Sequence, residues 1–164
     1  MKSTQFWEII ETSIQQKNTI DKSEQGDAIL AILLKLNPQE ILGFHRKLET
    51  LKQDLDTSEF NDIAFIMKYA DNKTALSGFK NWVIALGKEH YQKAKKSPSH
   101  LLTLDDPKLF VAVRAYLNDL DLVASVAYDD VSKKDDLSWY AVLQKDRRMK
   151  QLNKEQNIDI ELEQ

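Results

Sequence analysis

The residues whose types could support binding or acid–base chemistry lie together in one segment, residues 77–91. Trp82, Lys88, His90 and Tyr91 bring an aromatic surface, an ammonium group, an imidazole and a phenol into this segment. An imidazole can act as a general base or bind a metal, because its unperturbed pKa lies close to neutral pH. These four side chains are therefore the candidate ligand-binding residues of the chain.

We expect the candidate segment to form one helix with an apolar stripe. Two of the chain's four glycines fall in it. Each glycine costs about 1 kcal/mol relative to alanine inside a helix, so its presence indicates close packing or a surface that another group approaches. Trp82 lies beside the stripe, and Lys80 falls on a different face, where we expect a solvated ammonium group. The stripe recurs at three- and four-residue spacing and consists of Leu76, Phe79, Val83, Leu86 and His90.

The histidines do not show the spacing of a helical metal site. Such a site places two ligands one turn apart, and His45, His90 and His100 have no histidine at that spacing. We interpret His90 as a structural or solvated imidazole, and we leave the roles of ligand and general base open. Paired acids such as Asp105–Asp106 suit a helix N-terminus better than a cation site. The sequence therefore predicts no metal site.

Composition and missing motifs exclude several function classes. The chain lacks the glycine-rich phosphate and dinucleotide motifs and the hydrolase elbow, and it contains no cysteine. Its formal net charge of -3 gives no basic footprint for nucleic acid. No apolar run approaches the roughly 20 residues that span a bilayer. We expect a cytoplasmic protein that needs no cofactor and binds neither nucleic acid nor membranes.

Helices are expected along almost the whole chain. Only four glycines and three prolines interrupt it, and its 164 residues are the length of one domain. The clearest helix start is Asn37-Pro38-Gln39-Glu40, which offers a capping side chain, a proline at the first position and a glutamate at the third. Another helix should begin at Asp105–Pro107. The sequence predicts an all-α, single-domain bundle of about six to eight helices.

The last residues, 153–164, differ from the predicted helical domain of residues 1–152. Residues 158–163 alternate apolar and acidic side chains with a period of two, which is typical of a half-buried strand. A lone strand needs a partner edge, so we expect an acidic tail that is disordered or loosely docked. Pairing with another chain, or a small hairpin, is the alternative.

Three sequence blocks carry a family resemblance. They are FWEII at residues 6–10, PQEILGF at 38–44, and GFKNWVI at 78–84 followed by Gly87-Lys88 and Tyr91. In order and spacing these blocks resemble the DUF4240 family of uncharacterised bacterial proteins, over about residues 4–132. The resemblance implies a small helical domain in a bacterial cytoplasm, and it implies no reaction, cofactor or partner. The family pattern favours an acidic pair just before Gly78 and an arginine at the Lys80 position, from which this chain departs.

Two function classes follow from these observations. The first is a non-enzymatic protein-binding or regulatory module, for example of the immunity type that neutralises a toxin, with a protein partner on a helical face or on the tail. Formation of a homo-oligomer is also compatible with the sequence. The alternative is an enzyme or small-ligand-binding protein with a cleft near the 77–91 helix. That alternative requires a pocket in which at least two of Trp82, Lys88, His90 and Tyr91 converge.

Overall fold

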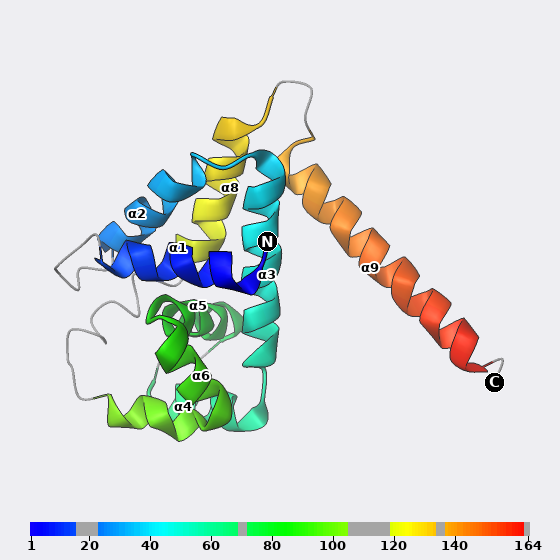
Figure 1. The fold of residues 1–164 in the computed structure, drawn as a ribbon. Helices are drawn as coiled ribbons and strands as arrows, with labels where there is room; N and C mark the ends of the chain where they lie inside the picture. The colour runs from blue at the N-terminus through cyan, green and yellow to red at the C-terminus, as the bar shows by residue number, and fades with distance from the viewer. Residues whose placement is uncertain (16–22, 69–71, 105–118, 134–136, 163–164) are drawn as a thin grey trace.

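Helix α3, Pro38–Asp54, runs through the body of the protein and contacts helices at both of its ends (Figure 1). The computed structural model describes residues 1–15, 23–68, 72–104, 119–133 and 137–162. The Asn37 side chain accepts a hydrogen bond from the Glu40 N–H at 3.0 Å, and the Glu40 carboxylate accepts one from the Asn37 N–H at 3.0 Å. This reciprocal cap confirms the helix start that the sequence predicts.

Two groups of helices pack against α3 (Figure 1). The first comprises α1, Ser3–Gln15, α2, Ser23–Leu33, and α8, Asp119–Val131. The second comprises α4, Ser58–Ile66, α5, Lys73–Ala85, α6, Lys88–Lys96, and the 3₁₀ helix η1, Pro98–Thr103.

The described residues contain helices and no β-strand, which confirms the all-α prediction. The helix that the sequence predicts to begin at Asp105–Pro107 lies outside the described residues. Among the helices of the described ranges, none combines the length and the apolar character of a membrane span.

Aromatic side chains from α1, α3 and α5 fill the core. Phe6 stacks on Phe44 with ring centroids 4.8 Å apart, and Phe79 lies 5.2 Å from Trp82. All four side chains are fully buried. Aromatic pairs at such distances contribute about 0.5–1.5 kcal/mol each beyond the area that they bury. The aromatic residues of the candidate segment are therefore part of the core.

Gly87 divides the predicted single helix of residues 77–91 into α5 and α6. Its φ of 102° lies in the region that glycine adopts easily, and a Cβ added there would lie 2.9 Å from a carboxylate oxygen of Glu11. The Glu11 carboxylate accepts a hydrogen bond from the Lys88 N–H at 2.9 Å. The prediction of a single helix was wrong, because Gly87 adopts a positive φ that ends α5. Sequence reasoning considered only the energetic cost of glycine within a helix.

Helix α9, Trp139–Leu162, leaves the body of the protein (Figure 1). Its first turns are anchored on α3, where Trp139 packs edge-on against His45 and Arg46 donates two hydrogen bonds to the Asp146 carboxylate at 2.6 and 2.7 Å. The helix runs without a break across the predicted boundary at residues 152 and 153. The strand-like alternation at 158–163 gives no strand over 158–162, where α9 continues, because a helix pairs its backbone groups internally and needs no partner edge.

Candidate functional site

Three of the four sequence-predicted site residues lie in different environments. Trp82 is fully buried in the core, whereas the Lys88 side chain is exposed. The Tyr91 hydroxyl is buried and donates a hydrogen bond to the Leu51 carbonyl at 3.2 Å, with an Asp54 carboxylate oxygen at 3.4 Å. Burial and the Asp54 charge raise the pKa of Tyr91 well above its ordinary range. These contacts give Tyr91 a structural role between α6 and α3.

His90, the fourth predicted residue, contacts His100 on η1. His90 Nδ1 lies 3.3 Å from His100 Nε2, and the two rings stack with centroids 5.6 Å apart. The pair forms because η1 follows α6 closely and packs against it, an arrangement that residue spacing along one helix does not reveal. Within the described ranges, no group of three or more His, Asp or Glu side chains could hold a metal ion.

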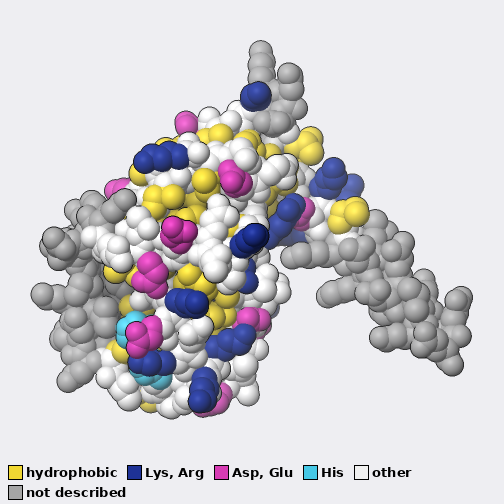
Figure 2. Space-filling view, in the orientation of Figure 1, with side chains coloured by type: hydrophobic (Ala, Val, Ile, Leu, Met, Phe, Trp, Pro, Cys, Tyr) yellow, Lys and Arg dark blue, Asp and Glu magenta, His cyan; other side chains and the backbone are white. Residues whose placement is uncertain are grey.

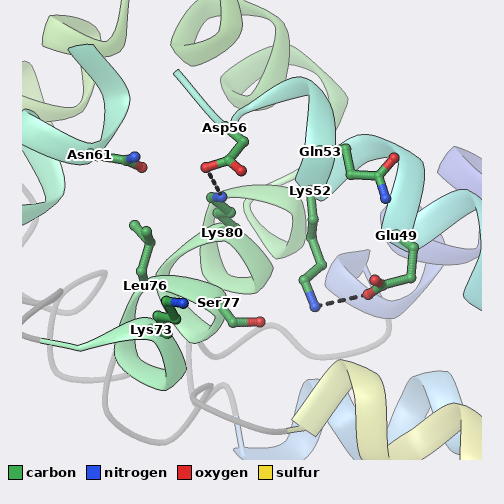
Figure 3. A pocket seen from close by; sticks show the side chains of 9 residues that line it. All are labelled: Glu49, Lys52, Gln53, Asp56, Asn61, Lys73, Leu76, Ser77 and Lys80. Atoms are coloured by element: carbon green, nitrogen blue, oxygen red, sulfur yellow. Dashed lines mark hydrogen bonds and ion pairs between the residues drawn. The ribbon is translucent and has the colours of Figure 1, made fainter. Parts of the chain in front are cut away.

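A cavity of about 460 Å³ opens between α3, α4 and α5 (Figure 3). From α3 and the turn after it come Glu49, Lys52, Gln53 and Asp56. From α4 and α5 come Asn61, Lys73, Leu76, Ser77 and Lys80. We call this space the lysine cavity. Its volume lies within the range of about 300–1,000 Å³ that is typical of small-molecule sites. None of the four sequence-predicted site residues lines it, so their part in ligand binding stays a prediction.

Lys80 is buried beside the lysine cavity and pairs with Asp56. Its Nζ lies 2.8 Å from Asp56 Oδ1 (Figure 3). The hydrogen bond and charge of Lys80, with a further hydrogen bond from Asn61, lower the pKa of Asp56 below its ordinary value. The prediction of a solvated Lys80 was wrong, because the turn between α3 and α4 places a carboxylate over this face of α5.

Lys52 forms a second ion-pair cluster at the lysine cavity. Its Nζ lies 2.9 Å from Glu49 Oε1 and 3.0 Å from Asp121 Oδ2. Burial lowers the pKa of Lys52, but the charges and hydrogen bonds of Asp121 and Glu49 outweigh burial and raise this pKa above its ordinary value. Asn81 donates to the same Asp121 carboxylate at 3.1 Å. The cluster therefore ties α3, α5 and α8 together.

Other polar groups of the lysine cavity are not engaged by the protein. Within the part of the chain that the structure describes, no hydrogen bond or ion pair joins the side chains of Gln53, Lys73 or Ser77 to another residue. The Asn61 Oδ1 atom is buried and has no hydrogen-bond partner there. A buried acceptor without a partner costs about 1–3 kcal/mol. The side chains of Gln53, Lys73 and Ser77 are therefore available to a ligand.

Lys73 differs electrostatically from the other two lysines of the cavity. It is exposed and occupies the first position of α5, whose first turn contains no acidic residue. The N-terminus of a helix carries partial positive charge, so a lysine there gains nothing from the helix dipole. Stabilisation of α5 therefore does not explain why a lysine occupies position 73.

The fold and the lysine cavity define a small all-α domain with a polar space large enough for a small molecule. The model of the family described as "Protein of unknown function (DUF4240)" matches residues 1–130. The chain therefore belongs to the DUF4240 family, as the sequence blocks indicate. All residues that line the cavity fall within the match, and α9 lies beyond it. No curated protein and no solved structure matches the chain.

The sequence does contain a signal for the lysine cavity. On α5, the polar residues Lys73, Ser77 and Lys80 recur at spacings of four and three, which places them on one helical face. The same spacing continues on α3 and the turn after it, where Glu49, Lys52, Gln53 and Asp56 share a face. A search for polar stripes, in addition to apolar ones, would have selected these residues.

Proposed function

We propose that this protein binds a small polar ligand in the lysine cavity. The observation that carries the proposal is a space of about 460 Å³ in which the side chains of Gln53, Lys73 and Ser77 have no partner within the described protein. Such groups can pair with polar groups of a ligand, and these hydrogen bonds contribute to its binding free energy. The proposal keeps the cleft near residues 77–91 that the sequence suggests, but places it on the face of α5 that bears Ser77 and Lys80.

The ionisable groups of the cavity support binding more than catalysis. A general acid or base works best when its pKa lies near the working pH. The ion pairs of the lysine cavity act in the opposite direction, because they lower the pKa of Asp56 and raise that of Lys52. Both groups therefore keep their charge at neutral pH, which suits electrostatic recognition.

A cavity-filling variant tests this proposal. A library of small metabolites would be screened by thermal shift and calorimetry against wild type, Ser77→Trp and Thr74→Trp. Ser77 lines the cavity, whereas Thr74 is exposed on the same helix and does not line it. We expect ligands that bind wild type and Thr74→Trp but not Ser77→Trp. Ligands that bind all three proteins equally would place the binding site elsewhere.

A protein-binding or regulatory role, including the immunity type, is the second candidate, and α9 is the observation that favours it. The helix leaves the body, and its Tyr140 and Met149 side chains are 71% and 51% exposed. Figure 2 shows apolar side chains on the surface where α9 leaves the body, and elsewhere on that face basic and acidic side chains are interspersed. Exposed apolar side chains on a helix that leaves the body are available to contact a partner protein.

Capture from the native cell tests the second candidate. Three baits would be compared: the intact chain, the double variant Tyr140→Asp/Met149→Asp and the control Leu102→Asp. The control changes an exposed apolar residue on η1. A partner of α9 is retained by the intact chain and by the control and lost from the double variant. Retention of the same proteins by all three baits would rule out α9 as the docking surface.

A further inference from the structure

We infer that the ligand of the lysine cavity is a small hydroxylated organic anion, whose carboxylate or phosphate pairs with Lys73 and whose hydroxyl groups bond to Ser77 and Gln53. This inference rests on the proposed function and specifies the chemical class of the ligand. It follows from which groups of the cavity already have partners and which do not.

The charges of the cavity select an anion. Lys80 is neutralised by Asp56, and Lys52 by Glu49 and Asp121. Among the described residues, Lys73 is the amine of the cavity that forms no ion pair. An anion that enters the cavity meets this amine without having to break an existing ion pair.

A cationic ligand fits these groups poorly. The carboxylates that could bind it, Glu49 and Asp56, are already held at 2.9 and 2.8 Å by Lys52 and Lys80. A cation that bound their remaining oxygens would lie close to the ammonium groups of Lys52, Lys80 and Lys73, which repel it. The cavity therefore disfavours cations.

The uncharged groups of the cavity are suited to hydroxyl groups on the ligand. Ser77 lies four residues after Lys73 on the same face of α5, and Gln53 lies across the cavity on α3 (Figure 3). The Ser77 hydroxyl and the Gln53 amide can each donate and accept hydrogen bonds. A carboxylate such as acetate supplies acceptors but no donor for their oxygen atoms. A hydroxylated acid or a phosphate ester of a polyol supplies both the negative charge and the donor.

Calorimetry with charge-matched probes tests the inference. The anionic probes are D-gluconate and sn-glycerol 3-phosphate, and their neutral counterparts are D-sorbitol and glycerol. The proteins are wild type, Lys73→Met, Lys73→Arg and a control, Lys35→Met, which removes an exposed lysine outside the cavity. Comparison of the two anions shows whether the site prefers a carboxylate or a phosphate.

We expect at least one anion to bind wild type, with an affinity about tenfold lower in Lys73→Met and near wild type in Lys73→Arg and Lys35→Met. The neutral counterpart should bind at least about tenfold more weakly than the anion. Failure of both anions to bind, or equal affinity for Lys73→Met, overturns the inference.

The proposed function is judged separately, by the Ser77→Trp screen. If that screen finds only neutral or cationic ligands, the inferred anion is wrong and the lysine cavity remains a binding site. If no ligand is lost in Ser77→Trp, both the inference and the proposed function are wrong.

Discussion

The ammonium group of Lys80 lies 2.8 Å from the carboxylate of Asp56, and the two partners differ strongly in exposure. The Lys80 side chain is 9% exposed and the Asp56 side chain 60% exposed. Removing one partner of an ion pair is costly when the remaining charge is buried and inexpensive when water can solvate it. Lys80 therefore depends on Asp56 more than Asp56 depends on Lys80.

Substitution of each partner should reveal this asymmetry. Asp56→Asn leaves the Lys80 ammonium without its counter-charge, and we expect it to lower the free energy of unfolding by about 1–3 kcal/mol. Lys80→Met replaces the buried charge by an apolar chain of similar length and should cost less. Urea denaturation measures both, with Asp62→Asn as a control on an exposed acid of α4. A larger loss in Lys80→Met than in Asp56→Asn would contradict the asymmetry.

The same ion pair should make stability depend on acid pH. Lys80 holds the pKa of Asp56 below its ordinary value of 3.8, so the pair's contribution is complete above 3.8 and is lost as pH falls through the lowered pKa. The stability difference between wild type and Asp56→Asn should therefore shrink between about pH 4 and pH 2. Denaturation curves across this range measure it. A difference that stays constant down to pH 2 would show that Asp56 is not the titrating group.

Gly87→Ala should destabilise the junction between α5 and α6. The added Cβ would lie 2.9 Å from a Glu11 carboxylate oxygen, and the φ of 102° would itself be strained for alanine. We expect a loss of about 1–3 kcal/mol in the free energy of unfolding. In the double variant Gly87→Ala/Glu11→Ala the steric conflict is gone and the strained φ remains, so recovery should be incomplete. Unchanged stability in Gly87→Ala would refute this explanation of the junction.

Tyr91→Phe should separate a structural role from a ligand-binding role. The substitution removes the hydroxyl that donates to the Leu51 carbonyl, and such a bond contributes about 0.5–1.5 kcal/mol to stability. Affinity for a ligand of the lysine cavity should not change, because Tyr91 does not line it. A loss of affinity without a loss of stability would instead support the sequence-based assignment of Tyr91 to a binding site.

Features encoded by neighbouring residues were predictable from the sequence. The α3 start depends on Asn37, Pro38 and Glu40, which satisfy one another's backbone groups within one turn. The buried position of Phe79 follows from apolar spacing along α5. Each of these features needs only a local pattern.

Features that depend on distant partners were not predictable in the same way. The break at Gly87 involves Glu11 on another helix, the burial of Lys80 needs Asp56 from the turn between α3 and α4, and the contact of His90 with His100 needs η1 to pack against α6. The lysine cavity lies between three helices and follows from their packing. Its residues showed a polar stripe, but a stripe alone does not distinguish a solvated face from a cavity.

Binding of a small polar ligand in the lysine cavity is tested most directly by amide chemical-shift mapping with the tightest ligand of the metabolite screen. We predict shift changes at residues 49–61 and 73–80, and their disappearance in Ser77→Trp. Changes confined to residues 139–162, or changes that persist in Ser77→Trp, would contradict the proposed site.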